Sequence, residues 1–540
     1  MKLLSRFAAA LLAALLLCTS LPPARGTGSG EIVGYYPAWA SGQGYAPRDL
    51  PASRLTQVNY AFAAIDPESC ALVLEYPERD RKNLAGLREL REAHPGLRLV
   101  LSAGGWEHSR HFSDAASTAR RREDFARSCL DLLRQEDLDG VDLNWEYPVS
   151  GGRPGIVHRP ADRENFTLLL RAVREALDAE TARTGRAYVL TATGAADPGF
   201  LDKIEPAAVS GTVDRLFLMA YDYQGPWDRR TGFNAPLSGV RSSVRAYLDR
   251  GIPAEKLVLG MPLYGYLYKG VSGGTDGLGG TFSSGEAVPY DTVVSKYLPS
   301  AACRQLHHPE ESVPYLRGNG TFLSYDDAAS IAEKAALARE LGLGGIGFWE
   351  LSQDRGAVLV ESACAAFTGE DAPWYVEAVE YVRERDWMTV PAPESPVSRG
   401  DLVTALHRME GAPAASGQPF PDIRETDSCA RSAAWAASAG IVTGYDDGTF
   451  GPGDPLTREQ FAALLWRHAR WRGMDTRPGA DLSAFADASA VSGYALEAVS
   501  WTVAEGLLQG RGPDALAPAG TVTQAEAAAV LMRFHRSLER

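Results

Sequence analysis

Eight short apolar stretches recur between residues 31 and 350 of this 540-residue chain, and charged sequence of helical character separates several of them, as at 79–93 and 121–135. Strands that alternate with crossover helices pair in parallel, and eight such units can close into a barrel. We therefore predict a (β/α)8 barrel of the α/β class, the TIM-barrel architecture. Its predicted strands are residues 31–36, 57–63, 97–106, 138–148, 188–194, 213–219, 257–261 and 345–350.

Polar or aromatic residues end the predicted strands. Barrels of this type build their sites at the C-terminal strand ends, so we expect these side chains to line one cleft. A single aromatic residue is more often part of the core. Repetition at strand ends favours a sugar polymer as ligand, because pyranose rings stack their flat apolar faces on aromatic rings. The residues are Tyr36, Phe62, Trp106, Glu146, Tyr221, Asp222, Tyr264 and Trp349.

The fourth predicted strand carries a row of polar side chains. Because side chains alternate between faces, Asp142, Asn144 and Glu146 point the same way. Hydrolysis of a glycosidic bond usually takes two carboxyl groups, ~5–5.5 Å apart for retention or ~6.5–9.5 Å apart for inversion. At about 3.3 Å per residue, Asp142 lies roughly 13 Å from Glu146. The strand therefore supplies one acid, Glu146, and no second nucleophile.

The same strand resembles a known signature. Asp139, Asp142 and Glu146 match the pattern Asp-x-x-Asp-x-Asp-x-Glu of glycoside hydrolase family 18, the chitinases, and Asn144 stands where the family usually has Asp. Further matches are Ser102-Ala103-Gly104-Gly105 to Ser-x-Gly-Gly, Met219-Ala220-Tyr221-Asp222 to Met-x-Tyr-Asp, and Trp349 to the Trp on the floor of the central subsite. The resemblance covers residues 31–370. It implies a catalytic domain at 27–370 with a small α+β insertion at about 265–325.

The resemblance implies hydrolysis of chitin or N-acetylglucosamine oligosaccharides with retention, by a substrate-assisted mechanism. The acetamido oxygen of the substrate attacks the anomeric carbon, while Glu146 protonates the leaving oxygen and later activates water. Asn144 brings no negative charge to the cationic intermediate. We therefore predict a working enzyme with reduced activity, in which Asp142 and Tyr221 contribute more to catalysis.

The resemblance also implies which residues bind the substrate. Tyr264-Gly265-Tyr266 departs from the family's Tyr-Gly-Arg, which leaves one expected contact without its usual residue. The implied substrate-binding residues are Tyr36, Phe62, Trp106, Tyr147, Met219, Asp222, Tyr264 and Trp349.

Residues 371–540 contain an internal repeat. Its spacing is 66 residues, which separates Trp435 from Trp501, Gly444 from Gly510, Thr457 from Thr523 and Arg467 from Arg533. An abbreviated earlier copy has Tyr381, Arg399 and Arg408 in corresponding places. Helical units too small to bury their own apolar face should pack together. We predict three copies, at 371–411 (abbreviated), 417–475 and 482–540.

These copies resemble S-layer homology modules, in the runs Phe420-Pro421-Asp422, Gly444-Tyr445-Asp446-Asp447-Gly448-Thr449-Phe450 and Leu456-Thr457-Arg458-Glu459-Gln460-Phe461. The resemblance implies a helical three-repeat domain that binds anionic bacterial secondary cell-wall polysaccharide, with an Arg of each copy meeting a carboxylate. A solvated residue at the helix start is the alternative for each Arg. The third copy has Gln524 in the Arg position. The implied wall-polymer contacts are Arg399, Arg458, Trp435 and Trp501.

No cofactor or metal is predicted. Asp446-Asp447-Gly448 resembles the start of a calcium loop, but a turn is favoured because the later ligand positions are missing. A net charge of −14 argues against nucleic acid as a partner.

Residues 1–24 have the features of a secretory signal peptide, with Lys2 and Arg6 beside a short apolar run. We therefore predict a secreted protein of the bacterial cell wall or S-layer, with no membrane contact after signal removal. The cysteines beyond this segment are odd in number and allow at most two disulfides. They are Cys70, Cys129, Cys303, Cys364 and Cys429.

Two alternatives to a chitinase stay open. One keeps the enzyme and changes the substrate to peptidoglycan or the core of N-linked glycans. The other is a catalytically weak chitin-binding lectin, which Asn144 favours and Glu146 opposes.

Overall fold

The computed structural model describes residues 30–538, apart from 299, 301, 372, 389, 391–392 and 513. The predicted signal peptide lies outside the described residues. All helices and strands given below belong to one unit that begins at Glu31. Within the described part of the chain, no helix is long and apolar enough to cross a membrane. The five cysteines named above are all free thiols.

Eight parallel strands close into a barrel, which confirms the predicted fold class. The strand β1 pairs with both β14 and β2, so the sheet has no open edge among these eight. A short antiparallel strand, β3 (Leu72–Val73), extends β2. The barrel strands are β1 (Glu31–Pro37), β2 (Gln57–Ile65), β4 (Arg98–Gly104), β5 (Gly140–Asn144), β6 (Val189–Ala195), β7 (Arg215–Met219), β8 (Leu257–Pro262) and β14 (Gly345–Trp349).

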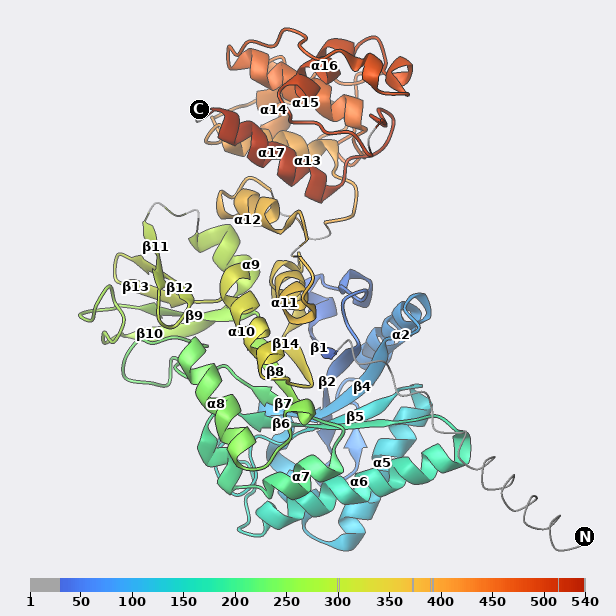
Figure 1. Cartoon of the computed structure of the whole chain (residues 1–540), viewed down its shortest axis with the longest axis vertical. Coiled ribbons are helices and arrows are strands. Elements are labelled where there is room, and N and C mark those ends of the chain that lie inside the picture. The colour runs from blue at the N-terminus through green and yellow to red at the C-terminus, as the bar shows by residue number, and fades with distance from the viewer. Residues whose placement is uncertain are drawn as a thin grey trace, which may run out of the picture. The chain divides into compact units, whose positions relative to one another are not determined.

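Helices surround the barrel, and Figure 1 shows α5, α6 and α7 against its outer face. Each buries one apolar stripe, as α5 does with Phe125, Cys129 and Leu133 at intervals of four residues. Strands covered by side chains within and by helices outside read as continuous apolar runs, which explains why all eight were visible in the sequence. The helices of this part are α2 (Pro77–Ala93), α3 (Gly105–His108), α4 (Phe112–Ala116), α5 (Ala119–Gln135), α6 (Asp162–Thr184), α7 (Pro206–Thr212), α8 (Leu237–Asp249), α10 (Ala328–Glu340) and α11 (Val358–Thr368).

An antiparallel sheet is inserted between β8 and α10. Its strand order is β10-β9-β13-β12-β11, and a short helix, α9 (Tyr290–Thr292), follows β10. Tyr268, Phe322 and Tyr315 pack ring against ring in its core. The strands are β9 (Tyr264–Lys269), β10 (Ser284–Pro289), β11 (Cys303–His308), β12 (Val313–Gly318) and β13 (Thr321–Ser324).

The remaining chain forms helices that pack in pairs. The pairs are α13 with α14, α15 with α16, and α12 with α17, so the first and last of these helices meet. Isolated bridges join the segments that precede the three long helices, at Pro396 with Thr523, Ser398 with Pro455 and Thr457 with Thr521. The helices are α12 (Val376–Glu384), α13 (Arg399–Met409), α14 (Ala430–Ser438), α15 (Arg458–Trp471), α16 (Leu496–Ala504) and α17 (Gln524–Leu538).

Candidate active site

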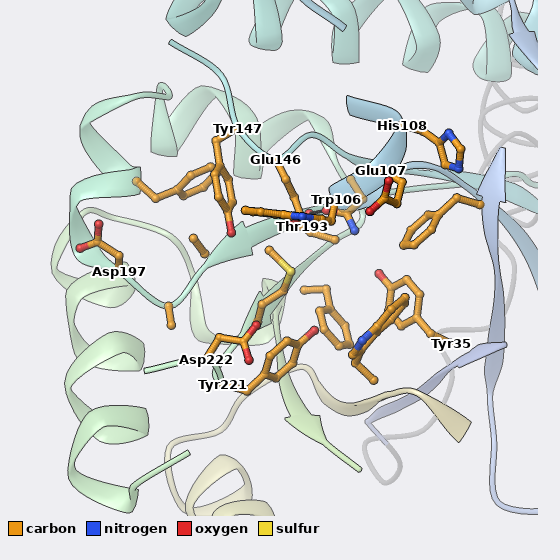
Figure 2. Close-up of a pocket in the computed structure, with 18 of the residues that line it drawn as sticks. Tyr35, Trp106, Glu107, His108, Glu146, Tyr147, Thr193, Asp197, Tyr221 and Asp222 are labelled. Atoms are coloured by element: carbon orange, nitrogen blue, oxygen red, sulfur yellow. Dashed lines mark hydrogen bonds between the residues drawn. The ribbon is translucent and has the colours of Figure 1, made fainter. Parts of the chain in front are cut away.

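A cavity of about 330 Å³ opens at the C-terminal ends of the barrel strands. Figure 2 shows Glu146 and Tyr147 on one side of it, with Tyr221 and Asp222 facing them. Nine of the predicted site residues line this cavity, which brings together motifs from five different strands. They are Phe62, Trp106, Asn144, Glu146, Tyr147, Met219, Tyr221, Asp222 and Trp349.

Glu146 is the acid of the cavity. Its residue is 9% exposed, and its backbone N–H donates to Ser109 Oγ at 2.8 Å, which fixes the chain just beyond β5. Burial and, second to it, the negative charge of Asp222 raise the pKa of Glu146 to about 8, although a hydrogen bond with the Asn144 side chain opposes both. The carboxyl group is therefore protonated at neutral pH and can donate a proton.

Asn144 lies between Glu146 and the next strand. Its Oδ1 accepts a hydrogen bond from Thr193 Oγ1 on β6. Its hydrogen bond to Glu146 favours the charged form of that acid. An amide held in this way orients Glu146 but cannot exchange a proton with it.

Asp142 does not reach the cavity. It is fully buried and accepts hydrogen bonds from Tyr35 Oη at 3.0 Å, Ser102 Oγ at 2.7 Å and Thr191 Oγ1 at 2.7 Å. Burial raises the pKa of Asp142, and these hydroxyl donors oppose the rise. The carboxyl group thus links its own strand, β5, to β1, β4 and β6 within the barrel.

Asp222 is hydrogen-bonded to two tyrosines. Tyr264 and Tyr266 both donate hydroxyl hydrogen bonds to its Oδ1, and its backbone N–H donates to Asn234 Oδ1 at 2.9 Å. Burial raises the pKa of Asp222, and both tyrosine hydrogen bonds oppose the rise. Tyr264, predicted to contact substrate, does not line the cavity and instead contacts Asp222, which does. Tyr266, in the place of the family's Arg, supplies the second hydroxyl.

Aromatic rings form part of the cavity wall. Trp349 stacks on Phe62 with ring centroids 5.4 Å apart and meets Tyr35 and Trp39 edge-on. Trp39 is 41% exposed and Trp106 is 48% exposed, so both side chains are accessible to a ligand in the cavity. The wall matches the flat apolar faces of pyranose rings.

The expectation for Tyr36 is wrong in this structure. Tyr36 is fully buried, and its hydroxyl donates to the carbonyl of Tyr45 at 2.8 Å. Its neighbour Tyr35 lines the cavity instead. Successive side chains of a strand point to opposite faces, so an error of one residue exchanges cavity for core.

Several residues of the cavity were missed in the sequence. Tyr35 could have been found from strand alternation, and Trp39 belongs to the same aromatic run. Thr193 lies on β6 and Asp197 and Lys203 follow it, in a stretch that no motif marks. For these three the sequence offers no signal.

The four predicted wall-polymer residues lie within the helical part. Trp435 and Trp501 are 4% and 1% exposed and pack in the core, so neither presents a face to a ligand. We correct their role to packing. Arg399 and Arg458 are 7% and 4% exposed, and the Nε atoms donate to the corresponding carbonyls of Phe450 and Leu516, each at 2.8 Å.

The two arginines differ in their charged neighbours. Arg458 Nη1 lies 3.6 Å from Glu526 Oε1, whereas Arg399 has no carboxylate within ion-pair distance among the described residues. The Arg399 guanidinium lies over the ring of Tyr445, 4.6 Å from its centroid. The stretch beside it forms a turn, in which Tyr445 N–H donates to the Thr449 carbonyl at 2.7 Å. No cluster of three or more metal-ligating side chains occurs in the described residues.

Two family models match the chain. The model for glycosyl hydrolases family 18 matches residues 31–354, and the model for the S-layer homology domain matches residues 419–462 and 484–528. These last ranges fall within the second and third predicted copies.

Proteins of other organisms are similar in sequence to the barrel part. Chitinase A1 of Niallia circulans is 36% identical over 400 residues, which is 61% of this chain and 57% of that protein, so the chain spans little more than half of that relative. Chitotriosidase-1 of Mus musculus is 32% identical over 329 residues, 57% of this chain and 69% of that protein.

Solved structures give the same likeness. Chitinase ChiW from Paenibacillus sp. str. FPU-7, described as a cell-surface-expressed multi-modular enzyme, superposes with a TM-score of 0.58 at 33% identity, over 63% of this chain and 43% of that one. A glycoside hydrolase family 18 N-acetylglucosaminidase from Paenibacillus barengoltzii gives a TM-score of 0.58 at 33% identity, over 63% of this chain and 100% of that one.

Proposed function

The chain belongs to glycosyl hydrolases family 18 and carries S-layer homology domains, and on this basis we propose that it is a secreted chitinase held at the bacterial cell surface. Its substrate is a β-1,4-linked N-acetylglucosamine polymer, and it cleaves with retention of anomeric configuration.

One observation carries the proposal. Glu146 is a buried carboxyl group with a pKa of about 8, and it lies in a cavity walled by aromatic rings. Such an acid stays protonated until a leaving oxygen needs its proton. The rings Trp349 and Trp106 suit a sugar chain bound across that acid.

The mechanism uses the substrate's own amide as nucleophile. The acetamido carbonyl oxygen attacks the anomeric carbon, the glycosidic bond breaks, and the Glu146 proton passes to the leaving oxygen. The resulting Glu146 carboxylate takes a proton from water, which opens the cyclic cationic intermediate at the anomeric carbon. Two displacements restore the original configuration.

Neighbouring residues support this chemistry in different ways. Burial and nearby acids raise the pKa of Tyr221 well above its ordinary value, so its phenol stays protonated and can donate to the acetamido oxygen. Asp222 supplies negative charge for the cationic intermediate. Asp142 acts from beneath, by holding Tyr35 and the strand that presents Glu146.

A single incubation tests the proposal. The full chain is mixed with a short N-acetylglucosamine oligomer, and the products are followed by proton NMR, which reports the anomeric form first released. We expect β-anomers from the wild type and no turnover from Glu146→Gln. Release of α-anomers would overturn the retaining mechanism. Faster cleavage of peptidoglycan or N-glycans than of chitin oligomers would transfer the proposal to those substrates.

Asn144 supports a second candidate, a chitin-binding lectin with weak catalysis. The position beside the acid carries an amide, so no negative charge there stabilises the intermediate. Oligomer binding measured by calorimetry, without cleavage after long incubation, would select this candidate.

The helical repeats are proposed to hold anionic wall polysaccharide through Arg399. Its guanidinium lies beside Tyr445 and lacks a carboxylate partner, as described above, whereas Arg458 is already beside Glu526. The test is cosedimentation of the full chain with purified bacterial wall polysaccharide. We expect Arg399→Gln to reduce binding and Arg431→Gln, an exposed arginine on α14, to leave it unchanged. Equal binding by all three proteins would contradict the role of Arg399.

A further inference from the structure

A second cavity of about 590 Å³ adjoins the catalytic cavity. Trp39 lines both cavities. The wall of the second cavity comes from three parts of the chain. Gln353 and Arg355 follow β14, Asp291 and Ser295 follow β10, and Arg383 belongs to α12 in the C-terminal helical part.

The helix α12 contacts the barrel part through partly buried polar groups. Glu380 accepts hydrogen bonds from Tyr290 Oη at 3.0 Å and from the backbone N–H of Ala328 at 3.2 Å. The Nη2 atom of Arg383 lies 3.7 Å from Asp291, and its Nη1 lies 3.9 Å from Asp354. The second cavity therefore has a wall that the barrel alone does not supply.

Polar atoms in this wall are buried without a hydrogen-bond partner. Arg383 is 6% exposed, and its Nη1 makes no hydrogen bond within the described part of the chain. The same holds for the buried Oε1 of Gln353. A buried donor or acceptor that stays unpaired costs about 1–3 kcal/mol. A donor and an acceptor that stay unpaired on two residues lining one cavity favour a ligand that can both accept and donate hydrogen bonds.

The composition of the cavity wall limits the chemical class of that ligand. Acidic and basic groups are mixed, because three acids lie beside two arginines, and neither sign of charge dominates. These residues are Asp291, Glu350, Asp386, Arg355 and Arg383. Apolar surface is present as well, from the 41%-exposed indole of Trp39 and from neighbouring aliphatic side chains. A neutral sugar combines an apolar ring face with hydroxyl groups that both donate and accept. The volume lies within the range of about 300–1,000 Å³ typical of ligand pockets.

We propose that this cavity is a distal sugar-binding subsite, completed by α12, which holds the part of a neutral N-acetylglucosamine chain that extends past Trp39. The inference rests on the proposed function, since the chain bound here continues from the catalytic cavity. It gives the C-terminal helical part a role in substrate length preference, in addition to anchoring.

Blocking the cavity at its rim tests this subsite. Ser295 is exposed and lines the cavity, while its neighbour Lys296 is exposed and does not. We expect Ser295→Trp to lower kcat/KM for a hexasaccharide about tenfold through KM, the loss that one missing sugar contact of moderate strength gives, and to leave a trisaccharide unaffected. Lys296→Trp is the matched control and should behave as wild type. An unchanged ratio of hexasaccharide to trisaccharide in Ser295→Trp overturns the proposal.

Binding measured without turnover separates the two proposals. In the Glu146→Gln background, calorimetry reports affinity for both oligomers. We expect Ser295→Trp to weaken only the hexasaccharide. If the oligomers bind but the wild type does not cleave them, the proposed activity fails while the subsite stands. If neither length binds, both fail.

A second variant tests the contribution of α12. Arg383→Lys keeps the positive charge beside Asp291 and removes the planar fork that carries Nη1. We expect the same selective loss for the hexasaccharide, with trisaccharide kinetics and the unfolding temperature close to wild type. Equal losses for both oligomers would show a structural effect and overturn the role of α12.

Discussion

Asp222 and Glu146 face each other across the catalytic cavity, and the negative charge of Asp222 raises the pKa of Glu146. The effect adds to that of burial, so the acid is kept protonated by two independent causes. Because Asp222 lies on the segment after β7 and Glu146 follows β5, closure of the barrel sets their separation. The pH dependence of catalysis should therefore report the charge on Asp222.

Replacing Asp222 should shift the alkaline limb of activity. Asp222→Asn removes the charge, and Asn also tolerates the positive φ of 63° at this position. The pKa of Glu146 falls, so the alkaline limb of kcat/KM should move from near pH 8 to lower pH by about one unit. Asp197→Asn removes a different carboxylate from the cavity wall and should leave the limb in place. An unshifted limb in Asp222→Asn would contradict the coupling.

Tyr266 should act on the same limb more weakly. Its hydrogen bond favours the charged form of Asp222, so Tyr266→Phe raises the pKa of Asp222 and reduces the negative charge facing Glu146. We expect a shift in the same direction as for Asp222→Asn but smaller. Tyr268→Phe, two residues along β9, is the control, because its hydroxyl does not contact Asp222. A shift toward higher pH would refute this account.

Restoring a carboxylate at position 144 should accelerate the enzyme. Asn144→Asp places a negative charge beside Glu146 and near the cationic intermediate. We expect kcat on an N-acetylglucosamine oligomer to rise on the order of tenfold, and the alkaline limb to move upward, since a like charge raises the pKa of Glu146. Steady-state kinetics across pH measure both. If kcat does not rise, position 144 does not limit turnover.

Asp142 should matter for stability as well as activity. Asp142→Ala leaves the hydroxyls of Tyr35, Ser102 and Thr191 without their shared acceptor, at a cost of about 1–3 kcal/mol in the free energy of unfolding. Calorimetry of the full chain should show the transition of the barrel at a lower temperature. Asp142→Asn keeps an acceptor and should lose less. Equal losses for the two variants would mean that these hydrogen bonds contribute little.

The barrel could be predicted because the signal for each strand lies within a short stretch of sequence. Each strand is an apolar run, and helical sequence follows most of them, so the eight stretches can be found without any knowledge of their contacts. The carboxyl at the end of β5 and the aromatic strand ends then gave most of the cavity. The prediction for Tyr36 is wrong because neighbouring strand residues point to opposite faces. A shift of one residue therefore exchanges the cavity face for the core face, and the sequence alone does not tell which residue of the pair faces the cavity.

The helical part shows a different limit. Trp435 and Trp501 recur at a spacing of 66 residues, and the resemblance to S-layer homology modules implies that they contact wall polymer. In the structure their recurrence reflects a repeated core position. Periodic residues mark what every copy needs in order to fold, and ligand contacts need not follow the period. The pairing of α12 with α17, distant in sequence, had no local signal at all.

That pairing has a consequence for how this region can change. An open array of repeats grows when another unit is added at either end, because each end offers a free face. Here α17 already covers the face of α12. The three repeats therefore form a closed ring, and neither end offers a free face to a fourth repeat. Insertion of another repeat would have to break one of the contacts between repeats. Loss of α17 would expose α12, the helix that also borders the second cavity.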